Sequence, residues 1–322
     1  MREQLSGPIW GLVILVVFVS IRAGASHLEY WLWERRVARD EAAAANECRA
    51  KAEAGDNVAM YELASRYEQG RGVEKDAVAA VRCFRIAADR GYRDAVNALG
   101  VAYLNGEGVE KDPSLAREWF EKAAAMGCGD AMRNLGLVHS QGWGVTVDER
   151  AAAEWFLKGA EAGDPGSMYE IAQVYRTASG VAQDRAASLM WYQRAWDGGV
   201  TASAAWLGVM YRLGWNGADD PLASTIYSFR AAKAGSDLGM LELGNAYLKA
   251  RGLVQDVKAA RHWWQRAAAL GNANAIFNLG LLHEYGWGVR RNIDEAISHF
   301  RRAEALGHKD AAKKIAKFSG LS

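Results

Sequence analysis

The sequence is poor in proline, in cysteine and in net charge. Only four prolines occur in 322 residues, and no Pro-rich or Gly/Ser-rich linker follows Gly55, which favours one continuous array over separate domains. The three cysteines, Cys48, Cys83 and Cys128, are odd in number, which excludes a disulfide-braced fold and is typical of core thiols. A net charge of +1 with mixed signs gives no broad basic surface, so we expect no nucleic-acid partner.

The sequence also lacks the short motifs of common catalytic and metal sites. It contains no H-E-x-x-H, no paired C-x-x-C, no G-x-S-x-G and no phosphate-loop pattern. Scattered carboxylates such as Glu107 and Asp130 fall where turns and helix caps are expected. We therefore expect no catalytic residue, no metal and no cofactor, and we predict a protein that is not an enzyme.

What the sequence does contain is a repeat. Glycines recur with an unbroken spacing of 36 residues, at 55, 91, 127, 163, 199, 235, 271 and 307. A period of this size is typical of stacked repeat arrays. The predicted units are 55–90, 91–126, 127–162, 163–198, 199–234, 235–270, 271–306 and a partial unit 307–322.

Each unit has the pattern of two helices joined by a turn. In the second unit, Ala95, Leu99 and Tyr103 form an apolar stripe at helical spacing, and Gly106 to Val109 then predict a turn. Asp112 predicts the N-cap of the second helix, whose apolar face includes Trp119 and Phe120. The same cap position holds Asp76, Asp112, Asp148, Asp184, Asp220, Asp256 and Asn292 in the seven complete units.

Three histidines stand where other units have large aromatic residues. His139 and His283 replace the tyrosine of the first helix, and His299 replaces the tryptophan of the second helix. We interpret them as substituted packing positions. The partial last unit carries Lys309, Lys313, Lys314 and Lys317, which predict a solvated outer face on a terminal cap.

The pattern of small residue, Leu-Gly, Tyr, Gly-x-Gly-Val, Asp, Ala and Trp-Phe resembles the Sel-like repeat (SLR) family, relatives of the tetratricopeptide repeats. The resemblance covers most of the chain, from Gly55 onward. It implies an all-α fold, a right-handed α-α superhelix (solenoid) of about seven and a half repeats, preceded here by a hydrophobic N-terminal helix. It also implies a scaffold or adaptor role, with the first helix of each unit lining the concave side.

The N-terminus predicts a membrane segment. An apolar run from Ile9 to Ile21 is shorter than the roughly 18 residues of a spanning helix, and Ala23-Gly24-Ala25 resembles a signal-peptidase site. We expect residues 1–33 to be either a cleaved signal peptide or a single-pass anchor with interfacial aromatic residues, and residues 34–54 to be a capping helix. Export would place the repeats in the periplasm. With a retained anchor, Arg22, Arg35, Arg36 and Arg39 favour repeats on the cytoplasmic face.

The fourth and fifth units depart from the pattern. Ala178 replaces a turn glycine, the fifth turn reads LGWNGADDP, and aromatic residues gather in this zone. Positions of the first helix that should face the groove also become apolar in the later units. These residues predict either a partner-binding surface or, alternatively, an irregular stack that buries them. The predicted partner-binding residues are Tyr169, Val209, Leu238, Leu241, Phe277, Leu281, Trp206 and Trp215.

Three functions fit these observations. The first is a membrane-associated or exported scaffold that binds a protein or peptide in the groove. The second is an immunity or inhibitor protein that neutralises an effector at the envelope. The third, a hydrolase, is disfavoured because the sequence shows no nucleophile and base in a recognisable arrangement.

Overall fold

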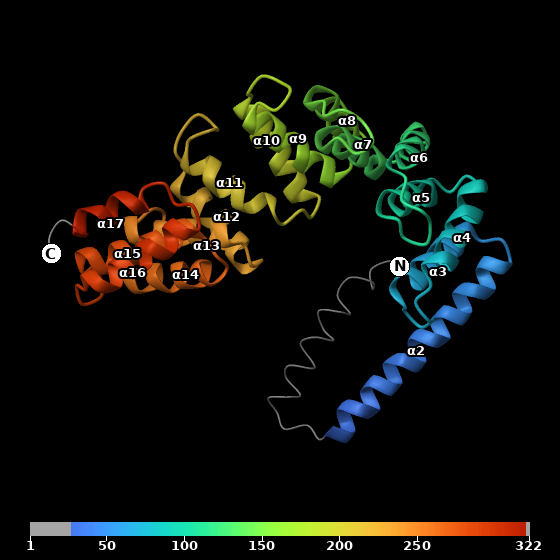
Figure 1. The fold of residues 1–322 in the computed structure, drawn as a ribbon, viewed down its shortest axis with the longest axis horizontal. Coiled ribbons are helices and arrows are strands. Elements are labelled where there is room, and N and C mark those ends of the chain that lie inside the picture. Colours follow the sequence, from blue (N-terminus) through green and yellow to red (C-terminus); the bar gives the residue numbers. More distant parts are fainter. Residues whose placement is uncertain (1–26, 320–322) are drawn as a thin grey trace. The chain divides into compact units, whose positions relative to one another are not determined.

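The computed structural model describes residues 27–319, which contain sixteen α-helices and no strand (Figure 1). The helices are α2 (His27–Glu53), α3 (Asn57–Gln69), α4 (Ala77–Asp89), α5 (Arg93–Asn105), α6 (Pro113–Ala125), α7 (Gly129–Gln141), α8 (Glu149–Glu161), α9 (Pro165–Thr177), α10 (Arg185–Asp197), α11 (Ser203–Arg212), α12 (Pro221–Lys233), α13 (Asp237–Lys249), α14 (Val257–Ala269), α15 (Ala273–Tyr285), α16 (Ile293–Ala305) and α17 (Ala311–Ser319). From α3 onward the helices alternate as the first and second helix of the predicted units. The prediction of an all-α fold built from helix pairs is confirmed.

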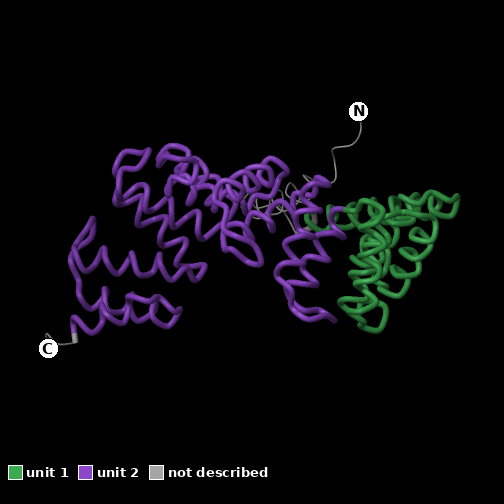
Figure 2. The backbone as a smooth tube through the Cα atoms, turned by 90° about the horizontal axis from the view of Figure 1, so that it is seen from above, with its two compact units in different colours: residues 1–128 green, residues 129–322 purple. Residues whose placement is uncertain are grey.

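The chain divides into two compact units at Cys128 and Gly129 (Figure 2). The first unit contains α2 to α6 and the second contains α7 to α17. Within each unit every helix packs on the next one along the chain. The two units are described separately below.

Aspartate or asparagine caps the second helix of every complete repeat, as predicted. The Asp112 carboxylate accepts hydrogen bonds from the backbone N–H groups of Ser114 and Leu115, both at 3.0 Å. These bonds satisfy N–H groups that have no partner inside the helix. The other six caps make the same type of bond, at Asp76, Asp148, Asp184, Asp220, Asp256 and Asn292.

Glycine allows the two helices of a repeat to approach closely. A Cβ atom on Gly100 of α5 would lie 2.5 Å from the Phe120 ring of α6, so no larger residue fits without a shift. Gly106 ends α5 with a left-handed backbone (φ 78°), a conformation that glycine adopts without strain. Val109, which follows in the turn, packs against the core of the first compact unit.

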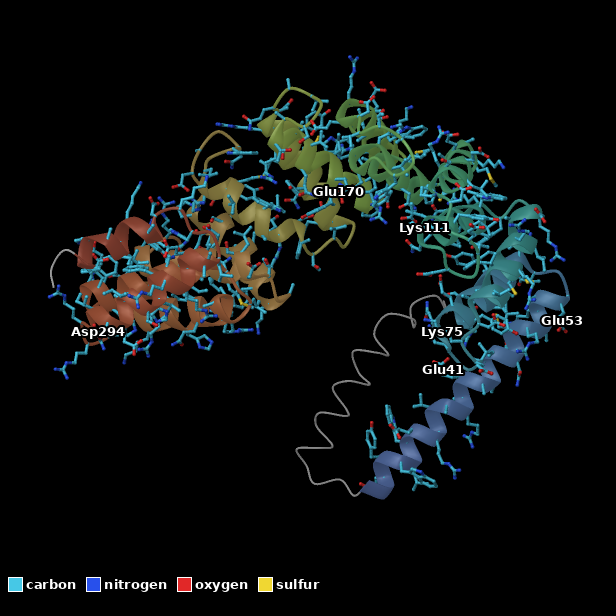
Figure 3. All side chains as sticks on the ribbon, in the orientation of Figure 1. Glu41, Glu53, Lys75, Lys111, Glu170 and Asp294 are labelled. Atoms are coloured by element: carbon cyan, nitrogen blue, oxygen red, sulfur yellow. The ribbon has the colours of Figure 1, made fainter. Side chains whose placement is uncertain are left out.

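Helix α2 joins the first repeat through its second half. Cys48 and Ala52 are buried in the same core as residues of α3, α4 and α5, and Ala45 is buried as well. Glu41, labelled in Figure 3, forms an ion pair with Arg66 of α3 at 3.1 Å. The Cys48 thiol donates to the Ala59 carbonyl at 3.1 Å, so it is a core thiol.

The predicted membrane segment from Ile9 to Ile21 lies outside the described residues. None of the helices within residues 27–319 is long and apolar enough to span a bilayer. At the start of α2, Tyr30 and Trp31 are exposed, and Arg35 lies 4.3 Å above the Trp31 ring. The membrane association of residues 1–33 stays a prediction.

Candidate functional site

The predicted partner-binding residues all lie in the second compact unit, residues 129–322. They belong to the first helices of four successive repeats and to one turn. Tyr169 is on α9, Trp206 and Val209 are on α11, and Trp215 follows α11. Leu238 and Leu241 are on α13, and Phe277 and Leu281 are on α15. The structure divides these residues between two hollows and the core.

Tyr169, Trp206 and Leu238 line one hollow of about 440 Å³, which we call the aromatic hollow. The turns before α11 and α13 supply most of the other lining residues, which are Thr201, Ala202, Ala205, Ala234, Gly235, Ser236 and Asp237. The wall therefore combines large apolar side chains with the hydroxyl groups of Thr201 and Ser236 and the carboxylate of Asp237. Such a mixture suits a peptide, because apolar anchors and polar groups that can form hydrogen bonds are both present.

Neighbouring side chains hold the two aromatic residues of this hollow. The Arg176 guanidinium lies 3.8 Å from the centre of the Trp206 ring, within cation–π distance. Tyr169 meets the edge of Tyr192 at 5.4 Å. Tyr192 is fully buried, and burial raises the pKa of its phenol, so it stays neutral at physiological pH. The aromatic wall is thus fixed before any ligand binds.

Leu241 and Leu281 line a second hollow of about 440 Å³, the asparagine hollow. Its lining residues are Leu241, Glu242, Asn245, Leu248, Lys249, Trp264, Asn274, Asn278, Leu281 and Trp287. Leu241 is only 5% exposed and belongs to the core around Trp264. It is therefore first of all a packing residue, whereas Leu281 is half-buried.

The other three predicted residues line neither hollow. Phe277 stacks on His308 at 4.0 Å between ring centres and also contacts Phe300. Val209 is half-buried on α11. Trp215 is half-buried in the irregular turn, with Arg185 at 5.4 Å from its ring.

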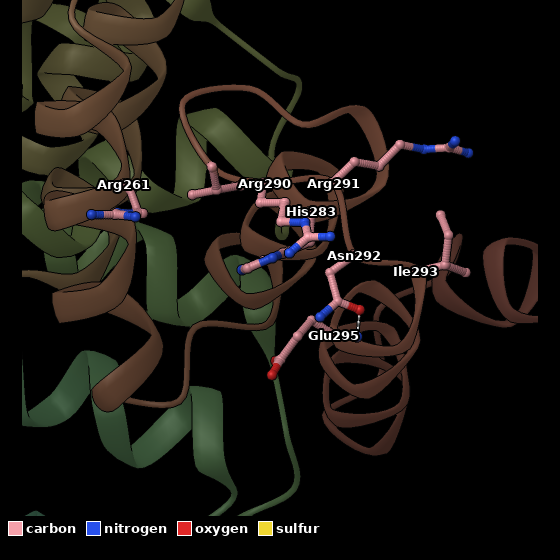
Figure 4. Close-up of a pocket in the computed structure, with 8 residues that line it drawn as sticks. Arg261, His283, Arg290, Arg291, Asn292, Ile293 and Glu295 are labelled. Carbon is pink, nitrogen blue, oxygen red and sulfur yellow. Dashed lines mark hydrogen bonds between the residues drawn. The ribbon is translucent and has the colours of Figure 1, made fainter.

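A third hollow, of about 690 Å³, was missed by the sequence analysis (Figure 4). We call it the arginine hollow, and it is lined by Arg261, His283, Val289, Arg290, Arg291, Asn292, Ile293 and Glu295. The sequence signal for it is His283, a histidine at a position where most repeats have tyrosine, which packing alone also explains. His299 lines an adjoining hollow of about 420 Å³ that shares Arg261 and His283 with the first.

No group of three or more His, Cys, Asp or Glu side chains within residues 27–319 is arranged to hold a metal ion. His283 and His299, which both line the adjoining hollow, stack with ring centres 5.6 Å apart. Burial lowers the pKa of His299, and the neighbouring His283 lowers it further. The arrangement offers hydrogen bonds and positive charge for recognition.

Comparison with known protein families identifies repeats of one kind along most of the chain. The model of the Sel1 repeat matches residues 57–92, 93–128, 129–164, 165–200, 238–272 and 273–308. These matches confirm the resemblance drawn from the sequence. The matched ranges omit residues 201–237, which contain α11 and α12 and carry the irregular turn.

Solved structures agree with this assignment. A protective antigen of uropathogenic Escherichia coli with an SLR fold is 33% identical over 85% of this chain, with a TM-score of 0.72. The present chain spans 58% of the length of that antigen. A Sel1 repeat protein from Oxalobacter formigenes is 26% identical and has a TM-score of 0.66, with 76% of this chain and 96% of that one covered. The comparison with curated protein sequences finds no match.

Proposed function

Because this chain belongs to the Sel1 repeat family, whose members are generally protein-interaction scaffolds, we propose that it is a non-enzymatic scaffold that binds a protein partner in the aromatic hollow. One observation carries this proposal. The hollow is built around α11, in the one stretch between residues 57 and 308 that the repeat model does not match. A departure from the repeat pattern that leaves aromatic side chains around a cavity supports a binding site at this place.

The physical properties of the hollow support a peptide anchor. A few large aromatic residues carry most of the binding energy of typical interfaces. Trp206 and Tyr169 are already held by Arg176 and Tyr192, so ordering them costs little on binding. Asp237 at the rim accepts a hydrogen bond from Asn272 at 2.8 Å, which fixes its carboxylate as well.

Site-specific photo-crosslinking in the native host tests the proposal. A photoreactive residue replacing Trp206 should crosslink a protein partner, and Trp206→Ala should weaken binding of that partner by about 2 kcal/mol or more. Trp263 is the matched control, because it is also half-buried and lies 4.7 Å from an arginine, Arg266, but lines no part of the aromatic hollow.

A crosslink from the Trp263 position alone would place the partner elsewhere, as would full binding by the folded Trp206→Ala variant. The crosslinked partner also decides between scaffold and inhibitor. If the partner is an effector whose activity falls in the purified complex, the chain is an inhibitor of the immunity type.

We also propose that residues 1–33 bring the repeats to the membrane or across it. The apolar run from Ile9 to Ile21 motivates this part of the proposal. Fractionation of cells that express the full chain should place it with the membranes or in the periplasm, and protein beginning at Glu34 should not go there. N-terminal sequencing then separates the variants, since a start at Ser26 means a cleaved signal and a retained Met1 means an anchor. Full-length protein in the cytosol with Met1 intact would contradict both.

A further inference from the structure

The seventh repeat differs from the others at two facing positions. The first helix of the other repeats has tyrosine or, at His139, histidine where α15 has His283. The second helix has a cysteine or a large aromatic residue where α16 has His299. Only the seventh repeat therefore has imidazoles at both places. In the sixth repeat, for comparison, Tyr247 and Trp263 occupy them.

The loss of aromatic volume coincides with the cavities. His283 lines both the arginine hollow and the adjoining hollow, and His299 lines the adjoining one. An imidazole is smaller than the phenol or indole that it replaces, so space opens between α14, α15 and α16. Arg261 of α14 faces both hollows, and Arg302 of α16 faces the second.

Two arginines of this site have unused donors. Within the described part of the chain, the guanidinium groups of Arg261 and Arg290 have no hydrogen-bond or ion-pair partner. Nδ1 of His283 is buried and likewise lacks a partner among the described residues. Arg291 differs, because it donates to the Glu284 carbonyl at 3.0 Å and points away from the other labelled side chains in Figure 4.

The lining is strongly unbalanced in charge. The free guanidinium groups of Arg261 and Arg290 face one carboxylate, that of Glu295, and Arg291 adds a third positive charge at the edge of the hollow. The whole chain carries a net charge of only +1, so this excess is local. An arginine guanidinium can donate two parallel hydrogen bonds to one carboxylate. Hydrogen bonds between ionised groups of this kind are about twice as strong as hydrogen bonds between neutral groups.

We propose that the arginine hollow binds an acidic peptide segment, rich in Asp and Glu, of a protein partner. Carboxylates of the segment would accept hydrogen bonds from Arg261 and Arg290. The near-neutral charge of the chain as a whole disfavours the extended polyanion of a nucleic acid, which needs a broad basic surface, whereas a short acidic segment needs only the local arginines. This inference rests on the proposed scaffold function and assigns a second contact to the partner.

Fluorescence anisotropy with the full chain and a fluorescein-labelled oligoglutamate peptide tests the inference. Arg261→Gln with Arg290→Gln should weaken binding about tenfold or more. The matched control is Arg301→Gln with Lys309→Gln, which removes the same charge from exposed positions outside the hollow and should change binding by less than about twofold. Equal losses in the two double variants, or equal binding of an oligoglutamine peptide, would overturn the inference.

Refilling the cavity gives a second, independent test. His283→Tyr with His299→Trp restores the side chains of the sixth repeat and should weaken oligoglutamate binding while the urea midpoint is retained. Unchanged binding by this folded variant would show that the peptide does not bind in the hollow.

A competition experiment distinguishes carboxylate from phosphate recognition. Inorganic phosphate should displace the peptide no better than chloride at equal ionic strength, and specific displacement would identify a phosphate site instead. Trp206→Ala should leave oligoglutamate binding intact, because Trp206 lies in the aromatic hollow. The oligoglutamate assay therefore tests the arginine hollow, and crosslinking at Trp206 tests the aromatic hollow separately.

Discussion

Nζ of Lys314 lies 2.7 Å from Oε2 of Glu284, whose side chain is only 3% exposed. Lys317 donates to the other carboxylate oxygen at 3.1 Å. Both lysines belong to α17, the last described helix, and Glu284 belongs to α15. Two ammonium groups therefore neutralise a buried carboxylate and tie the last helix to the repeat before it.

Removing both lysines should destabilise the C-terminal end. Lys314→Ala with Lys317→Ala removes both hydrogen-bond donors of the Glu284 carboxylate, which costs about 1 to 3 kcal/mol because Lys317 is already largely exposed and water can reach the site. Urea unfolding and hydrogen exchange of α15 and α17 measure the loss. Lys309→Ala with Lys313→Ala is the control, because it removes the same charge from exposed side chains and should change stability by about 0.5 kcal/mol or less. Equal losses would mean that net charge, not the buried pair, stabilises α17.

The same contact predicts a pH dependence. Burial of Glu284 opposes ionisation, but the hydrogen bonds from Lys314 and Lys317 outweigh it and hold the pKa of the carboxyl below its ordinary value of 4.5. A depressed pKa in the folded state means that the stabilisation is complete above pH 4.5 and is lost as the pH falls below it. The protection factors of the α17 amides, which correct for the intrinsic pH dependence of exchange, should fall in that range. Glu284→Gln should flatten this part of the profile, and a variant with an unchanged profile would contradict the prediction.

Much of this fold was predictable because each repeat carries local signals. The Asp or Asn cap and the first glycine of the turn each act within one helix pair, and the 36-residue period shows where each pair begins. The caps at Asp112 and its six equivalents form the predicted hydrogen bonds. The expectation for the terminal lysines was only partly right, because Lys314 is mostly covered and reaches Glu284, whereas Lys309 and Lys313 are exposed.

The hollows were harder to predict because they depend on contacts between helices. Leu241 has the apolar character of a groove residue, but it lies in the core, where the Trp264 indole donates to the backbone carbonyl of Leu241 at 3.3 Å. Helical periodicity gives the face of a helix and not what covers it. The arginine hollow depends on Arg261, His283 and Arg290, which come from α14, α15 and the turn after α15. The sequence signal at His283 and His299 had a sufficient explanation in packing alone.

Removal of one N-cap should weaken one repeat by a known amount. Asp112→Ala deletes the acceptor for the N–H groups of Ser114 and Leu115 and should cost about 0.5 to 2 kcal/mol. Asp112→Asn is the matched control, because asparagine is an equally good cap and should retain most of the stability. Urea midpoints of the three proteins give the comparison. Partner binding should be unchanged where the protein is folded, and a loss of binding without a loss of stability would make Asp112 a contact residue.

Two alanines sit where the other repeats have a glycine in the left-handed conformation. Ala178 ends α9 at φ 63° and Ala250 ends α13 at φ 53°, and they are the two residues other than glycine with positive φ in the described chain. In L-residues this conformation brings Cβ too close to the following carbonyl oxygen, which costs about 1 to 2 kcal/mol. Glycine avoids that clash but loses more chain entropy on folding, by about 0.5 to 1 kcal/mol.

Ala178→Gly should therefore stabilise the protein by about 0.5 to 1 kcal/mol, since the relief of strain exceeds the added entropy cost. Ala162→Gly is the control, because Ala162 also follows a helix but has φ −72°, where alanine is unstrained. That substitution should be neutral or destabilising by up to about 1 kcal/mol. Urea midpoints measured side by side give the sign of each change. If Ala178→Gly lowers the midpoint as much as Ala162→Gly does, the left-handed turn after α9 carries no strain, and the alanine there stabilises the irregular fourth repeat through its side-chain contacts.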